Sequence, residues 1–189
     1  MERQTIGFAL TGSFCTFSKI FPIIEEMVKK YDIIPIMSEV SASTDTRFGR
    51  CGDHKLKLEN LTGHDVLETV RDVEPLGPKK MLDALIVAPC TGNSIAKIAN
   101  GIADTSVTLA VKSHLRNKRP VIIGVSTNDG LGNNAKNIGL ILNMKNIYLV
   151  PFGQDDCIEK QNSLIADMSK IEETLELALL GKQIQPVLL

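Results

Sequence analysis

A doubly wound parallel α/β sheet is the fold class that the sequence predicts. Two observations support it: short apolar runs alternate with segments of helical period, and polar residues follow directly after four of the apolar runs. The chain has 189 residues, of which 43% are hydrophobic, and is long enough for one sizeable core but short for two. The prediction is therefore a single domain over residues 1–189 with a three-layer, Rossmann-like (flavodoxin-like) arrangement.

Five apolar runs are expected to form the strands of this sheet. They contain few polar residues, as is typical of parallel strands that are covered on both faces. The runs are residues 5–10, 33–37, 84–88, 121–125 and 147–150. Right-handed crossovers through helices join such strands, which gives the doubly wound topology.

Three further segments have a distinct helical or loop character. Apolar residues recur with helical period over 17–28, where Pro22 predicts a kink or a helix restart because proline removes a backbone donor. A C-terminal helix is expected at about 162–181, with Gly181 as its stop and a short tail after it. Residues 41–63 have weak periodicity and are expected to form a long loop with one short helix.

Composition and charge exclude several classes of function. The net charge of −1 indicates no basic footprint for nucleic acid. The four cysteines, at 15, 51, 90 and 157, have the spacing of neither a zinc site nor a disulfide framework. We therefore expect no bound metal, and we expect a cytoplasmic protein whose cysteines are reduced. The longest apolar runs are too short for a membrane span.

The polar loops after the strands are expected to form one binding rim, because doubly wound sheets bind ligands beyond the carboxyl ends of their strands. In the first loop, Gly12 allows close backbone approach, and a helix start after Ser13 supplies free N–H groups for an anion. An ordinary strand-to-helix turn with a serine cap is the alternative. The sequence contains neither GxGxxG nor a P-loop, so a mononucleotide phosphate is favoured.

A second part of the rim begins at Pro89, where the third apolar run stops. The stretch "APCTGNSIAKIANGIADT" supplies more short polar groups than one helix cap requires. The Asn93 amide and the Ser94 hydroxyl are suited to the edge of a planar heterocycle. Cys90 either lines this edge or simply packs in the core, as cysteine often does.

These motifs also carry a resemblance to a known family. The order "ALTGSF", "APCTGNSIAKIANGIADT" and "GVSTNDGLGNNAKN" resembles the FMN-dependent flavoproteins, which include cysteine decarboxylases and phosphopantothenoylcysteine decarboxylase. The runs "EPLGPKKMLDALIVAPCTGNS", "LRNKRPVIIGVSTNDGLG" and "NIYLVPFGQDD" resemble one member more closely, over nearly the whole chain. That member belongs to a two-subunit oxidoreductase, so the resemblance implies an oxidoreductase that needs its partner subunit for activity.

The resemblance implies FMN as the cofactor and assigns its contacts to residues of this chain. The flavin phosphate would meet Gly12, Ser13 and Phe14, with Ser38 as a further contact. The ring or the substrate would meet Pro89, Cys90, Thr91, Gly92, Asn93, Ser94, Thr127 and Asn128. Of these, Cys90, Asn93 and Asn128 are the candidates for a catalytic role.

Further expectations concern the partner and the substrate. The resemblance implies NADP on the partner subunit, a small dicarboxylate substrate and a homo-oligomer. A dianionic substrate calls for cationic contacts, and the candidates in the long loop are Arg47, Arg50 and Lys55. The alternative for each of them is an ordinary charged residue of a solvated loop.

One departure from the family pattern limits the reaction. Decarboxylating relatives have a catalytic histidine where this chain has Pro75, and the three histidines (His54, His64 and His114) are expected at the surface or in caps. Cysteine decarboxylation is therefore not expected. Two alternatives remain: a flavin-dependent decarboxylase or transferase acting on another acid, and a non-catalytic subunit that organises the partner.

Overall fold

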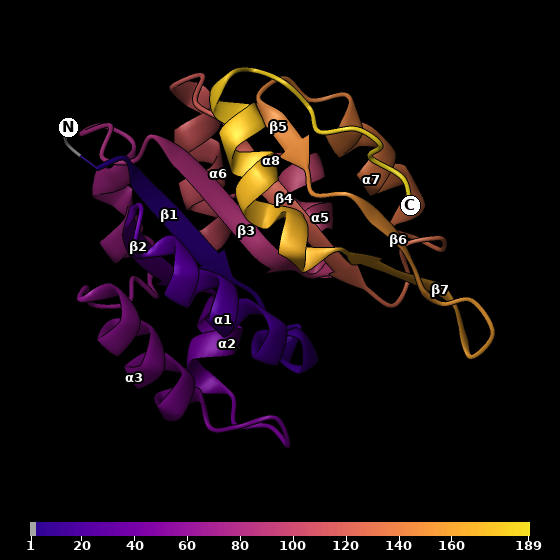
Figure 1. Cartoon of the computed structure of the whole chain (residues 1–189), viewed down its shortest axis with the longest axis horizontal. Coiled ribbons are helices and arrows are strands. Elements are labelled where there is room, and N and C mark those ends of the chain that lie inside the picture. Colours follow the sequence, from indigo (N-terminus) through magenta and orange to yellow (C-terminus); the bar gives the residue numbers. More distant parts are fainter. Residues whose placement is uncertain (1–2) are drawn as a thin grey trace.

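The computed structural model describes residues 3–189 and contains one seven-stranded sheet (Figure 1). Its hydrogen-bonded order is β2-β1-β3-β4-β7-β6, and β5 pairs with β4 outside this path. The strands are β1 (Thr5–Leu10), β2 (Asp32–Met37), β3 (Ala84–Cys90), β4 (Val121–Thr127), β5 (Ile147–Leu149), β6 (Phe152–Asp156) and β7 (Lys160–Ala166). All five predicted strands are present, and β6 and β7 are additional.

The first five strands form the parallel part of the sheet, in the order β2-β1-β3-β4-β5. The chain moves outward from β1 to β2, returns to β3 on the other side of β1, and continues to β4 and β5. The strand order therefore reverses between β1 and β3, and the carboxyl ends beside such a reversal are the usual ligand site of this fold. The predicted flavodoxin-like α/β class is confirmed.

Helices cover both faces of the sheet. α1 (Phe17–Met27) and α8 (Ile171–Leu179) lie on one face, and α5 (Gly92–Ala99), α6 (Ser106–Arg116) and α7 (Ala135–Leu142) lie on the other (Figure 1). The shorter elements are α2 (Glu39–Ser43), α3 (Cys51–Thr62), α4 (Val70–Val73) and the 3-10 helices η1 (Phe14–Thr16), η2 (Glu74–Leu76) and η3 (Met168–Lys170). Within residues 3–189, no helix has the length and apolar character needed to cross a membrane.

The two central strands show why the sequence lacks an alternating pattern there. Every residue of β3 and β4 is buried, because helices cover these strands from both sides. Gly124, in the middle of β4, leaves no room for a side chain, since a Cβ there would lie 2.9 Å from the Cβ of Ala88. The core therefore holds β3 and β4 in fixed positions, and their carboxyl ends with them.

The C-terminal helix is shorter than the expected 162–181. Residues 162–166 belong to β7, and helical structure begins at η3 and continues as α8 to Leu179. The spacing from Leu164 to Met168 fits a helix, but Leu164 instead pairs with Thr127 of β4 in an antiparallel register. Pairing with β4 and β6 therefore overrides the local helical pattern, as tertiary context commonly does.

Three smaller expectations also change. The segment 41–63 contains the 12-residue α3, whose one fully buried residue is Leu58, so it has little periodic signal. α1 continues through Pro22 without a restart. His114 is buried in α6, and His54 is half-buried with its ring stacked on Phe21, so neither is a surface residue.

Candidate functional site

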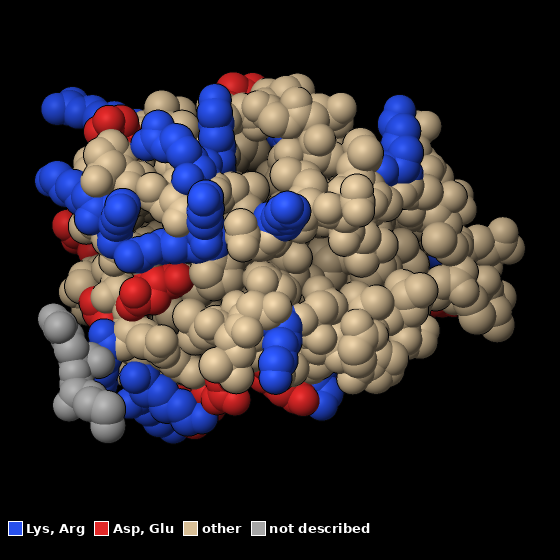
Figure 2. All heavy atoms as spheres, turned by 90° about the horizontal axis from the view of Figure 1, so that it is seen from above, with Lys and Arg blue, Asp and Glu red and all other residues tan. Residues whose placement is uncertain are grey.

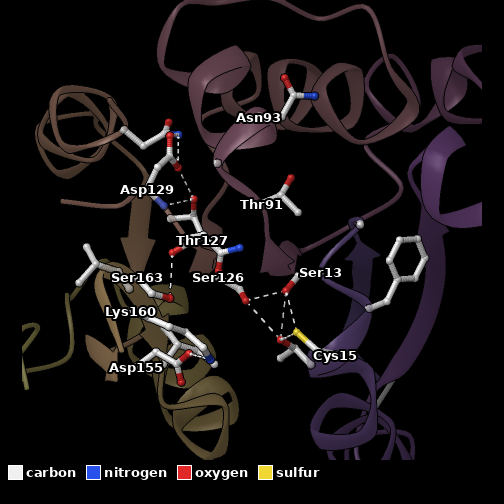
Figure 3. A pocket seen from close by; sticks show the side chains of 18 of the residues that line it. Ser13, Cys15, Thr91, Asn93, Ser126, Thr127, Asp129, Asp155, Lys160 and Ser163 are labelled. Atoms are coloured by element: carbon white, nitrogen blue, oxygen red, sulfur yellow. Dashed lines mark hydrogen bonds and ion pairs between the residues drawn. The ribbon is translucent and has the colours of Figure 1, made fainter. Parts of the chain in front are cut away.

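A cavity of about 960 Å³ opens at the carboxyl ends of β1, β3 and β4 (Figure 3). Loop 11–16 forms the first wall of the cavity, and the start of α5 forms the second. The third wall is formed by the loop after β4 together with the start of α7. Strand β7 and the loop around Arg47 complete the lining. The volume is typical of a cofactor site.

Loop 11–16 brings unpaired backbone donors to the cavity wall. The loop turns sharply, with a hydrogen bond of 2.7 Å from the Ser13 N–H to the Thr11 carbonyl. The N–H groups of Phe14 and Cys15, at the start of the helical segment, donate to no acceptor within residues 3–189. A Cβ at Gly12 would have no neighbour closer than 3.7 Å, so open space adjoins these donors. Free N–H groups at a helix start beside open space are suited to an anion.

The Ser13 hydroxyl joins this loop to the end of β4 instead of capping the helix. It makes no capping hydrogen bond. Its Oγ lies 2.7 Å from the Oγ of Ser126 and 3.2 Å from the Oγ1 of Thr16, and the latter two atoms are 3.2 Å apart (Figure 3). These three residues, here called the hydroxyl cluster, fix the loop after β1 against β4.

Thr91 caps α5 and anchors its start to β1. Its Oγ1 accepts a hydrogen bond from the Ser94 N–H (3.4 Å), and its own N–H donates to the Thr11 Oγ1 (2.9 Å). The Thr11 hydroxyl in turn donates to the Pro89 carbonyl (2.7 Å). Asn93, in the first turn, is exposed, and its amide has no partner within the described chain. This amide is therefore free to bind a ligand.

Asp129 organises the third wall. The Thr127 hydroxyl donates to Oδ1 of Asp129 (2.6 Å), and the Asn134 amide donates to both carboxylate oxygens (2.8 and 2.9 Å). These hydrogen bonds, above all the one from Thr127, hold the pKa of Asp129 below its usual range, so the carboxylate stays ionised. Because the Thr127 proton is directed at Asp129, the Thr127 oxygen faces other groups as an acceptor.

Gly92 packs directly against this wall. A Cβ at Gly92 would lie 2.5 Å from both the Asn134 Nδ2 and the Thr127 Oγ1, and 2.8 Å from the Asp129 Oδ1. Real Cβ atoms do not approach other atoms so closely, so a side chain would force α5 away from the loop after β4. The close approach of the two walls therefore requires glycine at this position.

Three cationic side chains line the cavity: Arg47, Lys136 and Lys160. Lys160 forms an ion pair with Asp155 at 2.8 Å, which raises the pKa of Lys160. Arg47 lies with its guanidinium carbon 4.8 Å from the centre of the Phe48 ring. Neither Arg47 nor Lys136 forms an ion pair in the described part of the chain, so both are available to an anionic ligand.

Eight of the twelve predicted binding residues line the cavity: Gly12, Ser13, Phe14, Thr91, Gly92, Asn93, Thr127 and Asn128. Four do not: Ser38, Pro89, Cys90 and Ser94. Ser38 instead caps α2 by accepting a hydrogen bond from the Ser41 N–H (3.2 Å). Ser94 is buried behind Thr91, and the two hydroxyl oxygens are 3.1 Å apart. Pro89 contributes its carbonyl to the Thr11 contact described above.

The position of Cys90 fits the packing alternative and not a place in the cavity lining. Cys90 is 0% exposed at the end of β3, where its side chain belongs to the core. Burial also raises the pKa of its thiol well above the usual range, which opposes formation of a reactive thiolate.

Of the three cationic residues suggested as substrate contacts, one lines the cavity and two do not. Arg47 lines the cavity, whereas Arg50 precedes α3 and does not. Lys55 pairs with Glu68 at 3.1 Å and lies outside the cavity lining. Lys136, on α7, lines the cavity although it was not among the candidates from the sequence.

The contribution of the β6–β7 hairpin was missed from the sequence. The hairpin residues that line the cavity are Asp155, Lys160, Ser163, Leu164 and Ile165. The Asp156 carboxylate accepts hydrogen bonds from the N–H groups of Ile158 and Glu159 (3.0 Å each) and so closes the turn of the hairpin. An aspartate at the start of "DCIEK" is a turn signal that would have identified it.

The fold and the cavity define the class: a doubly wound α/β protein with a ligand site at the β1/β3 rim. The Flavoprotein family model matches residues 1–177, and the chain belongs to this family.

Two similar proteins extend over nearly the whole chain. The dipicolinate synthase B subunit of Bacillus subtilis (strain 168) is 44% identical over 189 residues, which is 100% of this chain and 94% of that protein. The crystal structure of the dipicolinate synthase B subunit from Bacillus halodurans has 42% identity and a TM-score of 0.90, and the match covers 98% of this chain and 96% of that one. The FMN binding protein AtHal3 has 18% identity and a TM-score of 0.67, over 93% and 96% of the two chains, and so shares the fold.

Proposed function

We propose that this chain works as the B subunit of a dipicolinate synthase, and that its rim cavity holds FMN for the oxidation of dihydrodipicolinate to dipicolinate. Similarity over the full length to the two Bacillus proteins supports this assignment. The observation that carries it is the pair of unpaired N–H groups at Phe14 and Cys15, which adjoin the open space at Gly12 inside a cavity of cofactor size.

The residues of the cavity fit FMN. The free N–H groups of loop 11–16 would bind the phosphate, with the partial positive charge of the helix start behind them. The flavin ring carries carbonyl acceptors and one N–H donor. The Asn93 amide offers both a donor and an acceptor, and the Thr127 oxygen offers an acceptor. FMN bound there would supply a two-electron acceptor.

Arg47 and Lys136 are the proposed contacts of the substrate carboxylates. Both line the cavity, and Lys160 is already neutralised by Asp155. The oxidation removes a hydride and a proton from the substrate; bound FMN would supply the hydride acceptor, and solvent would take the proton. Both carboxylates remain in the product, so charged contacts at Arg47 and Lys136 orient the ring without being changed by the reaction.

The described cavity lining favours oxidation over decarboxylation. No histidine lines the cavity within residues 3–189, and Pro75 lies in η2, outside it. Asp129 is held ionised by its hydrogen bonds and is a poor proton donor. Asn93 and Asn128 remain the proposed polar contacts at the reacting edge of the substrate.

The proposed partner is a dipicolinate synthase A subunit that binds NADP. Both Bacillus relatives are named as B subunits, which supports the existence of a partner chain. A homo-oligomer is also proposed, and the related Burkholderia xenovorans protein DmrB is described as a cubic protein cage. We propose that the protein works in the mother-cell cytoplasm of a sporulating bacterium.

A second candidate function is a flavin-dependent decarboxylase or transferase that acts on another acid. The similarity to phosphopantothenoylcysteine decarboxylase of Oryza sativa, 30% identical over 105 residues, favours it. A non-catalytic protein that organises the A subunit is the remaining alternative.

The test is the rate of dipicolinate formation from dihydrodipicolinate, followed by pyridine absorbance. The samples are the A subunit with this chain, the A subunit alone, and this chain alone. We expect the pair to exceed the A subunit alone and no carbon dioxide to be released from phosphopantothenoylcysteine. A rate for the pair equal to that of the A subunit alone contradicts the proposal, and carbon dioxide release selects the decarboxylase instead.

A further inference from the structure

Positive charge is concentrated at the amino ends of the strands, on the side of the sheet opposite the cavity. Figure 2 looks onto this end, where Lys and Arg side chains gather on one part of the face with a few Asp and Glu side chains beside them. Contacts of Arg119 with Lys80, and of Arg116 and Asn117 with Gly77, bring two basic segments together at this end of the sheet. The cations of these segments are here called the basic edge: Lys79, Lys80, Arg116, Lys118 and Arg119. These residues come from two segments: the loop before β3 and the turn between α6 and β4.

The two segments are locked together, so the basic edge is a preformed surface. The Arg119 guanidinium donates hydrogen bonds to the carbonyls of Lys80 (3.1 Å) and Leu82. The Asn117 amide donates to the Gly77 carbonyl (2.8 Å). A preformed surface loses little conformational freedom when a partner binds.

Two lysines of the basic edge have a left-handed backbone: Lys118 directly after the C-cap of α6, and Lys80 in the turn that its N–H closes onto the Gly77 carbonyl. Lys80 and Lys118 have φ angles of 49° and 56°, the left-handed region in which glycine or asparagine avoids a steric cost. The negative end of the α6 dipole explains cations near Arg116, because cations are favoured at helix C-termini. It does not explain Lys79 and Lys80, which precede β3.

Charge is poorly compensated at this edge. Asp83 is the carboxylate that pairs with the group, at 3.8 Å from Arg119. The whole chain has a net charge of −1, so the excess of positive charge here is balanced by negative charge elsewhere. Met81 lies next to Lys80 in the same loop and is 46% exposed.

We propose that the basic edge docks an acidic surface of another protein, with Met81 as its apolar contact. Cations around an exposed methionine fit a protein interface, where an apolar contact is flanked by charged pairs. The five residues of the basic edge include no aromatic side chain on which a base would stack, which favours a protein partner over a single-stranded nucleic acid. The edge lies at the amino ends of the strands, so docking leaves the cavity at their carboxyl ends open. This proposal is independent of the reaction proposed above.

The test uses a fluorescent poly-glutamate peptide with a central leucine pair, titrated at low and at physiological ionic strength. The wild-type chain should bind it, and salt should weaken binding. The variant K80E/K118E should lose about tenfold or more in affinity, because two attractions become repulsions. The matched control K19E/K57E reverses two exposed charges on α1 and α3 and should change the affinity by less than about twofold. Circular dichroism checks that each variant is folded.

Two further arms complete the test. M81A should weaken binding several-fold without changing its dependence on salt, since it removes only an apolar contact. Duplex DNA is titrated in parallel. Three results would each overturn the proposal. They are absence of peptide binding at low ionic strength, equal peptide affinity of K80E/K118E and K19E/K57E, and tighter binding of DNA than of the peptide. The last result would indicate a nucleic-acid surface.

Discussion

The hydroxyl oxygens of Ser13 and Ser126 lie 2.7 Å apart, although the two residues are separated by 113 positions in the chain. Ser13 belongs to the loop after β1, and Ser126 is near the carboxyl end of β4. β3 lies between these strands in the sheet, so the contact joins the loop after β1 to the end of β4 across β3. It ties the proposed phosphate loop to the wall that holds Asp129.

Ser126→Ala should weaken FMN binding more than it weakens the fold. The substitution removes two hydroxyl contacts, to Ser13 and Thr16, and one hydrogen bond contributes about 1 kcal/mol to stability. We expect a loss of roughly 1 kcal/mol in the free energy of unfolding and a several-fold rise in the FMN dissociation constant. Urea unfolding and flavin fluorescence measure the two. Ser43→Ala, at an exposed hydroxyl on α2, is the control, and equal FMN affinity in both variants would count against a role for the hydroxyl cluster.

Gly92→Ala should destabilise the protein by about 1–3 kcal/mol, because its Cβ would overlap the Thr127 and Asn134 side chains. Gly139→Ala is the matched control: Gly139 lies in α7, and a Cβ there would have no neighbour within 4 Å. The control should be neutral or more stable by up to about 1 kcal/mol, since alanine favours a helix. Urea unfolding of both variants checks this, and the same stability for the two would contradict the close packing at Gly92.

Thiol reagents should separate Cys90 from the cysteines at the surface. Cys15 and Cys157 are exposed, whereas Cys90 is buried and the pKa of its thiol is raised. We expect rapid labelling of Cys15 and Cys157 in the folded protein and labelling of Cys90 only after unfolding. Mass spectrometry of the labelled peptides measures the order. Rapid modification of Cys90 would restore it as a candidate for the site.

Acid should destabilise the fold through His114. Burial lowers the pKa of His114 to about 4, compared with an ordinary value of 6.5. The fold therefore favours the neutral ring: this contribution is complete above about pH 6.5 and is lost as pH falls toward 4. Between pH 8 and pH 5, wild type should lose roughly 2 kcal/mol more unfolding free energy than His114→Gln. Urea unfolding at both values tests this, and parallel losses in the two proteins would show that His114 is not the titrating group.

Topology made much of the fold and part of the site predictable. Apolar runs such as 84–88 identify parallel strands, and parallel strands bring their following loops to one rim, so Gly12, Asn93 and Asn128 were correctly grouped. Cys90 was misplaced because the last residue of β3 still points into the core. No local feature of the sequence indicates that direction.

The β6–β7 hairpin was beyond local sequence analysis because its stability comes from pairing with β4. Its outer half is exposed and polar, and Leu164 fits a helical spacing with Met168. The left-handed lysines and the burial of His114 likewise depend on contacts between distant segments.

The central claim is that the open space beside Gly12 receives the phosphate of FMN, and a flavin titration of wild type and Gly12→Val tests it most directly. A Cβ at Gly12 has neighbours no closer than 3.7 Å in the protein, so the variant should fold. Its branched side chain should nevertheless occupy the space where the backbone meets the anion. We predict that wild type binds FMN with a change in flavin absorbance and fluorescence, and that folded Gly12→Val binds about tenfold or more weakly, since loss of a hydrogen bond to a charged group costs about 1.5–3 kcal/mol. No uptake of FMN by wild type, or equal affinity in the variant, would contradict the account.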